Sequence, residues 1–180
     1  MAARKLSSHV VGYIGERLVE VYTIMSSSGK LTSFKPGVDI DHKDLIFDEL
    51  GRNRNVYAQV KCALAVDPHG VVHFNAKFAD ADIPSSARFV YILCRLDANK
   101  MALTHVWFVP SKDFNELATH AKYQGRIVLL ASPGVTKRSK WNPYRVTPDE
   151  LGPKLLYIAR HAPAEEPMNL PGALLLLAGR

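Results

Sequence analysis

The chain of 180 residues and 20.0 kDa carries 23 lysine and arginine residues against 17 aspartate and glutamate residues, a formal net charge of +6. Hydrophobic residues make up 47% and charged residues 22%, which excludes a wholly disordered chain and is typical of one globular domain. No apolar run reaches the roughly 18 residues of a membrane-spanning helix, and the positive charge favours polyanionic partners such as nucleic acid.

The first half of the chain predicts one helix followed by strands. Five apolar residues recur every three or four positions over residues 7–26, as on one buried helical face: Val11, Ile14, Leu18, Val21 and Met25. Ser7 or Ser8 is expected to cap this helix. Strands are predicted over residues 31–34, 44–50, 56–65 and 71–78, separated by turns rich in Gly, Pro and Asn.

The second half predicts a strand hairpin and two further helices. After a polar, irregular stretch at 79–87, the strongly apolar strands 89–96 and 103–109 are joined by the loop 97–100. A helix over 112–121 with Ser111 as its N-cap, a strand over 126–131, a basic loop over 132–142 and a helix over 147–158 complete the domain. This order predicts an α/β domain with a mixed central sheet flanked by helices.

Composition changes at the C-terminal end of the chain. Residues 1–160 are predicted to form the domain, and residues 161–180 a linker followed by the apolar tail 173–180. The tail is expected to pack on the domain or on a second subunit, and in the second case it would form a homo-oligomer. Cys62 and Cys94 lie in apolar runs and are expected to be buried thiols of a reducing compartment. The protein is expected to be cytoplasmic or nucleoid-associated, and the lack of a long apolar run argues against a membrane partner.

The strand over 56–65 carries the most informative polar residues. Val56, Ala58, Val60 and Cys62 point to one face, and Tyr57, Gln59 and Lys61 point to the other. Gln59 and Lys61 are therefore about 6.5–7 Å apart along one face. A lysine facing inward from a central strand needs a compensating group, because burying an ammonium is costly.

These residue types fit phosphodiester hydrolysis. Mg²⁺ prefers hard oxygen ligands, which Asp39, the Gln59 amide and the Val60 backbone carbonyl would supply. The cation would stabilise charge on the phosphate and lower the pKa of its bound water. Lys61 would orient or activate that water and screen the phosphate, while Glu16 would hold a second ion or a metal-bound water.

Three short motifs carry a resemblance to a known family. They are Gly12-Tyr13-Ile14-Gly15-Glu16, Gly37-Val38-Asp39-Ile40-Asp41 and Tyr57-Ala58-Gln59-Val60-Lys61-Cys62, with the later strand His105-Val106-Trp107-Phe108-Val109-Pro110. Together they resemble the PD-(D/E)XK nuclease superfamily in its D…QxK form, in particular its Mrr-like and uncharacterised restriction-endonuclease-like branches. The resemblance covers about residues 8–120. It implies a restriction-endonuclease-like αβββαβ core with Asp39, Gln59 and Lys61 as active-site residues and Glu16 as an accessory one.

The chain departs from the family pattern at three points. Pro36 stands three residues before Asp39, so the Pro-Asp dipeptide is absent. Gln59 replaces the commoner acidic ligand, which removes one negative charge from the metal site. The helix that usually follows the lysine strand is reduced to residues 79–87.

Other readings of these residues stay open. A Gln-x-Lys pair on a strand is often a solvated face. Asp41 ranks second to Asp39 as a ligand because it would face the opposite side of a strand, and Asp44 and His42 are further candidates. Asp48 and Glu49 are expected to end a strand at solvent.

Basic residues mark the expected nucleic-acid contacts. The loop near residue 140 interleaves cations with aromatic rings, and the contacts expected there are Lys137, Arg138, Lys140, Trp141 and Arg145. Trp141 would stack an unpaired base; the alternative is that it packs inward. Arg52 and Arg54 are expected to flank the site, or else to serve solubility.

The sequence therefore predicts a Mg²⁺-dependent endodeoxyribonuclease-like domain, in which Mn²⁺ is expected to substitute for Mg²⁺. A catalytically attenuated module that binds nucleic acid or assembles on the same fold is the alternative. A purely structural homo-oligomer is a third, weaker reading.

Overall fold

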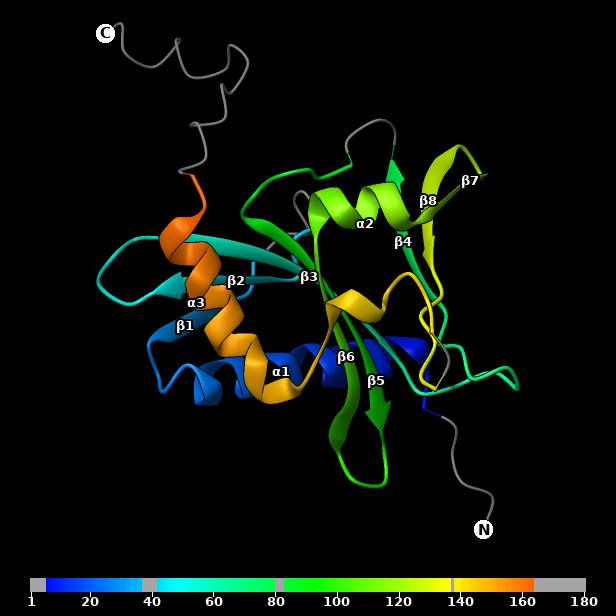
Figure 1. Cartoon of the computed structure of the whole chain (residues 1–180), viewed down its shortest axis with the longest axis horizontal. Helices are drawn as coiled ribbons and strands as arrows, with labels where there is room; N and C mark the ends of the chain where they lie inside the picture. Colours follow the sequence, from blue (N-terminus) through cyan, green and yellow to red (C-terminus); the bar gives the residue numbers. More distant parts are fainter. Residues whose placement is uncertain (1–5, 37–41, 80–82, 137, 164–180) are drawn as a thin grey trace, which may run out of the picture.

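The computed structural model describes residues 6–36, 42–79, 83–136 and 138–163. Figure 1 shows its elements, which follow one another in this order: α1 (Ser8–Ser26), β1 (Leu31–Phe34), β2 (Leu45–Glu49), β3 (Asn55–Ala63), β4 (Phe74–Ala79), β5 (Phe89–Asp97), β6 (Ala102–Pro110), α2 (Ser111–Leu117), β7 (Thr119–Tyr123), β8 (Arg126–Ala131), the 3-10 helix η1 (Asn142–Tyr144), β9 (Arg145–Val146), the 3-10 helix η2 (Pro148–Glu150) and α3 (Leu151–His161).

A mixed sheet of six strands forms the centre of the fold, in the order β1-β2-β3-β5-β6-β9. β3 and β5 are parallel, with Gln59 beside Tyr91 and Lys61 beside Leu93, whereas the other neighbours are antiparallel. β4, β8 and β7 form a separate antiparallel sheet in that order. The predicted α/β fold with a mixed central sheet and flanking helices is confirmed.

The connection between the parallel strands β3 and β5 departs from the usual arrangement. Parallel neighbours need a crossover, which is most often a helix. Here the described part of the connection contains β4, which leaves the central sheet and pairs with β8 from Phe74↔Ala131 to Ala79↔Arg126. No helix lies in the described part of this crossover. Residues 80–82 lie outside the described residues, so the reduced helix predicted over 79–87 stays a prediction.

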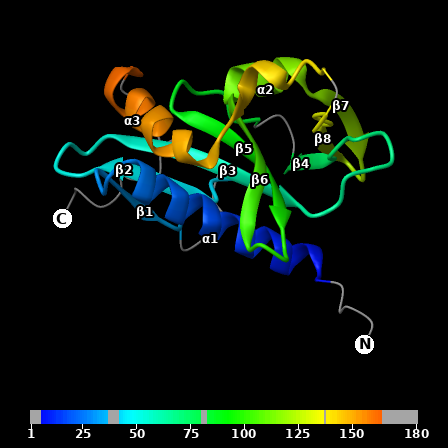
Figure 2. The same ribbon diagram turned by 60° about the horizontal axis from the view of Figure 1, so that its bottom comes forward.

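One face of the central sheet is covered by α1 and α3 (Figures 1 and 2). Val56, Ala58 and Val60 of β3 point into this first core, together with alternate residues of β5. α3 approaches α1 closely at Gly152, where an added Cβ would lie 2.4 Å from the backbone nitrogen of Ser27. The glycine thus allows the two helices to share one sheet face.

The opposite face is covered by α2 and the smaller sheet. Phe89, Tyr91 and Leu93 of β5 face this second core, which also contains both tryptophans. β5 is therefore buried on both faces, which explains why its sequence is an uninterrupted apolar run rather than an alternating one.

The buried face of α1 differs from the predicted one. Val21 is 50% exposed and Met25 72%, so the prediction was wrong for both. The buried positions are Val11, Gly15, Val19 and Thr23. Gly15 and Thr23 are small and let the helix approach the sheet. Because neither is strongly apolar, the pattern of hydrophobic residues does not predict this buried face.

Several element boundaries also differ. The predicted helix 112–121 ends at Leu117, and Thr119–Tyr123 pairs with β8 as the strand β7. Ser111 does not cap α2: its hydroxyl accepts from the Ser86 N–H and donates to the Ser86 carbonyl. The strand predicted from residue 71 begins at Phe74, and the last helix runs to His161 after η2.

Two predictions concern the chain ends and the membrane. Among the described residues, no helix combines the length and apolar character needed to cross a membrane. The segment 164–180 lies outside the described residues, so the linker, the tail and an oligomer formed through the tail stay predictions.

Candidate active site

The site begins at an unpaired stretch on one edge of β3. β2 pairs with β3 only as far as Leu45↔Ala58, so beyond Ala58 no described strand pairs with this edge of β3. The Asp44 carboxylate accepts the Val60 N–H at 2.7 Å in place of a strand carbonyl. Because the N–H and C=O of one strand residue point to the same edge, the Val60 carbonyl faces this open edge too.

α1 brings a carboxylate to the same place. Ser7 caps the helix by accepting from the Val10 N–H at 3.3 Å. Gly15 lets the helix approach β3, because an added Cβ would lie 2.4 Å from the Cβ of Cys62. The next residue, Glu16, is paired with Lys35 at 2.6 Å and its side chain is 16% exposed.

A cavity of about 440 Å³ joins these elements. Among the described residues, its acidic and basic lining includes Glu16, Asp44, Lys35 and Lys61. Val60 and Asn75 also line it, the latter from β4. Lys61 has no hydrogen bond or ion pair to another described residue, which leaves its ammonium available to a ligand.

Gln59 lies on the same face of β3 as Lys61 and is only 3% exposed. Its side-chain oxygen is buried and accepts no hydrogen bond from a described residue. A buried amide oxygen without a partner is costly, since it has lost its hydration without a replacement. This oxygen has the chemistry of a hard-cation ligand, the role predicted for it.

The residues present fit a magnesium ion only in part. Carboxylate and backbone oxygens are among the ligands that Mg²⁺ prefers, and the cavity lining offers them in Glu16, Asp44 and Val60. Gln59 is not among the residues that line the cavity, although its buried amide oxygen lies two residues along β3 from Lys61. Within the described ranges, no three His, Cys, Asp or Glu side chains gather closely enough to hold an ion. The predicted ligand Asp39 and its alternative Asp41 lie outside the described residues, so the ligand set stays a prediction.

His42 does not line this cavity. Its ring packs edge-on against Phe78, with the centroids 4.7 Å apart. Its position against an aromatic side chain favours a packing role over the predicted alternative of a ligand.

The basic loop presents its cations but not its tryptophan. Trp141 is 1% exposed and packs against Phe114 in the second core, so the inward alternative holds and its ring cannot stack on a base. Arg138, Lys140 and Arg145 are exposed, and Arg145 donates to the Val135 carbonyl at 3.0 Å. Lys137 lies outside the described residues.

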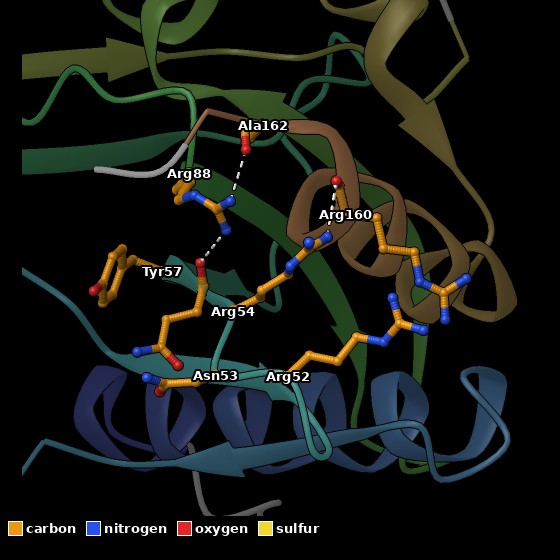
Figure 3. A pocket seen from close by; sticks show the side chains of 8 residues that line it. Arg52, Asn53, Arg54, Tyr57, Arg88, Arg160 and Ala162 are labelled. Carbon is orange, nitrogen blue, oxygen red and sulfur yellow. Dashed lines mark hydrogen bonds between the residues drawn. The ribbon is translucent and has the colours of Figure 1, made fainter. Parts of the chain in front are cut away.

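Arg52 and Arg54 do not line the cavity that contains Lys61. They lie in the turn between β2 and β3 and line a second pocket with Arg88 and Arg160 (Figure 3). Glu49 was expected at solvent, but it is 4% exposed and accepts from Arg160 at 2.6 Å. The last turn of α3 covers this end of β2 and supplies the partner.

Sequence reasoning missed parts of both pockets. Sequence analysis assigned no role to Asn75 or to the buried Arg88. It considered Asp44 only as a metal ligand, whereas its carboxylate accepts the Val60 N–H at the edge of β3. Asp44 directly precedes an apolar strand, a position where a carboxylate often bonds to backbone N–H groups. Arg88 has no comparable local signal, because its partners are about 30 to 75 residues away.

A comparison of folds finds similarity to solved structures, among them that of the bacterial homing endonuclease I-Ssp6803I. The match has a TM-score of 0.51 at 15% sequence identity, and it covers 86% of this chain and 96% of that chain. No family profile matches this chain, and no curated protein is significantly similar to it in sequence. The likeness shows a nuclease-like fold.

Proposed function

We propose that this protein is a metal-dependent DNA endonuclease that hydrolyses phosphodiester bonds in the cavity at the open edge of β3. The proposal rests on two polar side chains that share one face of β3. Within the described part of the chain, the Lys61 ammonium has no partner, and neither does the buried amide oxygen of Gln59, two residues away on the same face. The likeness in fold to a homing endonuclease supports DNA as the substrate.

The proposed roles follow from the chemistry of each group. Hydrolysis adds water across a P–O bond, so the attacking water loses a proton and the leaving oxygen gains one. Lys61 would hold a phosphate oxygen or orient the attacking water, and its charge would offset the charge that develops on phosphorus-bound oxygens. Asp39, Gln59 and the Val60 carbonyl would hold Mg²⁺ or Mn²⁺, which supplies charge stabilisation and a more acidic bound water. Glu16, held by Lys35, would act as the accessory carboxylate.

The first prediction concerns Lys61→Ala. Nicking of supercoiled plasmid by the full chain in Mg²⁺ is expected to fall by about 10²–10⁴-fold, the usual contribution of a group that assists proton transfer. Chelation of the metal should stop the wild-type reaction. Lys100→Ala removes an exposed lysine from the turn between β5 and β6 and should leave nicking unchanged. Full nicking by Lys61→Ala, or nicking without a metal, would contradict the proposal.

The alternative is a nucleic-acid-binding module with attenuated chemistry. The Glu16–Lys35 ion pair favours it, because a carboxylate already neutralised by a lysine binds a cation less well. Salt-sensitive DNA binding that survives Asp39→Ala, together with no cleavage by the wild type under any divalent metal, would select this alternative.

A further inference from the structure

The second pocket, which we call the arginine pocket, lies where the β2–β3 turn meets the C-terminal end of α3. It has a volume of about 450 Å³ and is lined by Arg52, Asn53, Arg54, Tyr57, Arg88 and Arg160, among others (Figure 3). Four guanidinium groups thus converge from three different segments of the chain.

Arg88 is a buried cation that lacks a carboxylate. It is 8% exposed, and its guanidinium donates to the carbonyls of Asn55, Ala162 and Pro163 at 3.0, 2.6 and 2.7 Å. These carbonyls satisfy its N–H groups, and those near the end of α3 carry partial negative charge. They do not cancel a full positive charge, and no carboxylate in the described part of the chain is paired with Arg88.

The other three arginines share one acid. Glu49 accepts from Arg160 at 2.6 Å, and the same oxygen lies 3.7 Å from Arg52. Arg54 donates one terminal N–H to the Arg160 carbonyl at 3.1 Å. Its remaining donors have no carboxylate partner among the described residues. Among the described residues, the four arginines and Glu49 leave an excess of three positive charges at the pocket, and a bound anion would lower their mutual repulsion.

β3 links this pocket to the candidate active site. Tyr57 lines the arginine pocket and Lys61 lines the other cavity, and the two side chains point to the same face of the strand. Four residues of a strand span about 13 Å. Lys43 adds a cation on this face, with its ammonium 4.2 Å from the centre of the Tyr57 ring.

Two phosphates of one DNA strand could occupy the two pockets. Successive phosphates rise about 3.4 Å along the helix axis and also turn around it, so phosphates about 13 Å apart in space are only a few nucleotides apart along the strand. Arginine is also the side chain best suited to phosphate, because its planar donors match the phosphate oxygens in pairs.

We propose that the arginine pocket binds a backbone phosphate of the DNA, a few nucleotides from the phosphodiester at Lys61. Arg52 and Arg54 make the contact, while Arg88 and Arg160 hold the end of α3 in place behind them. The identity of the ligand rests on the proposed function, but the phosphate contact can be tested apart from cleavage.

The second prediction is measured as DNA binding by the full chain carrying Lys61→Ala, so that the duplex stays intact. Arg52→Gln together with Arg54→Gln should weaken binding of a labelled duplex. The slope of log K against log salt should become shallower by about 0.9 over about 50–200 mM salt, as expected for one lost phosphate contact. Fluorescence anisotropy gives both quantities.

The matched control removes the same charge from a distant element. Lys122→Gln together with Arg126→Gln neutralises two exposed cations at the β7–β8 hairpin and should leave the slope unchanged. If both double variants changed the salt slope equally, the change would reflect net charge alone, and the proposal would be wrong. It would also be wrong if the Arg52 and Arg54 substitutions left the slope unchanged. Should the double variant unfold, Arg52→Gln alone retains the test, because that side chain is 59% exposed.

The two proposals can fail separately. If the salt slope of DNA binding depended on Arg52 and Arg54 but the wild-type protein never nicked DNA, the nuclease proposal would be wrong and the phosphate pocket would be supported. If nicking depended on Lys61 but the salt dependence of DNA binding did not change with Arg52 and Arg54, only the phosphate-pocket proposal would be wrong.

Discussion

Glu49 and Arg88 are two buried charges that the fold accommodates in different ways. Arg88 is held by backbone carbonyls, whereas Glu49 has a charged partner, Arg160, from the last turn of α3. The hydrogen bond from Arg160 lowers the pKa of Glu49, against the opposing effect of burial, and the charges of Arg160, Arg52 and Arg54 lower it further. The ionised carboxylate therefore favours the folded state.

The third prediction follows from that pKa. Because folding lowers the pKa of Glu49 below its usual 4.5, the stabilisation is present above pH 4.5 and is lost as the pH falls through the lower, folded-state value. Glu49→Gln should lower the free energy of unfolding at pH 7 by about 1.5–3 kcal/mol, the range for hydrogen bonds to charged groups. It should also flatten the loss of stability below pH 4.5. Urea titrations at several pH values test this, with Glu116→Gln on the exposed side of α2 as the control.

At the scale of elements, α1 shows how glycines position a helix. Gly12 and Gly15 lie in the same helix, yet a Cβ at Gly12 would meet nothing within 4 Å, whereas one at Gly15 would lie 2.4 Å from the Cβ of Cys62. Gly15 therefore determines how closely α1 approaches β3, and with it where Glu16 meets the cavity.

The fourth prediction compares these two glycines. Gly15→Ala should destabilise the protein by about 1–3 kcal/mol through overpacking against β3. Gly12→Ala should be neutral or should stabilise the helix by up to about 1 kcal/mol, because alanine has the higher helix propensity. Thermal unfolding of both variants measures the difference, and equal effects would contradict the close approach at Gly15.

At the scale of the whole molecule, two cores share one central sheet. The first core lies under α1 and α3, and the second lies under α2 and the smaller sheet. β5 contributes alternate residues to both, so neither core is complete without it. This shared strand is expected to couple the unfolding of the two halves.

The fifth prediction uses the two tryptophans as reporters. Trp107 and Trp141 belong to the second core, and Leu155 is buried in the first. Leu155→Ala should destabilise the protein by about 2–5 kcal/mol and shift the tryptophan fluorescence transition together with the far-ultraviolet circular dichroism transition. Leu130→Ala, at a 38% exposed position, should shift both only slightly. An unchanged fluorescence midpoint in Leu155→Ala would mean that the two cores unfold independently.

The sequence by itself determined most elements and the face on which Gln59 and Lys61 lie. Those features depend on local periodicity: alternation along β3 assigns its faces, and β1 and β8 have the bounds predicted for them. Apolar runs also distinguished the buried strands β5 and β6. The predicted boundary near residue 118 was wrong, because β7 forms by pairing with β8 and has no apolar pattern of its own that would indicate a strand.

Only the tertiary structure decided which face of α1 is buried, that Trp141 packs inward, and that Arg52 and Arg54 belong to a pocket with Arg88 and Arg160. These outcomes depend on contacts between segments far apart in the chain, such as Arg88 with Ala162 or Glu49 with Arg160. A carboxylate at a strand end has the same local sequence whether water or an arginine from the last helix faces it. Long-range packing alone selects between the two, because the free energy of burying a charge depends on the partner that folding brings to it.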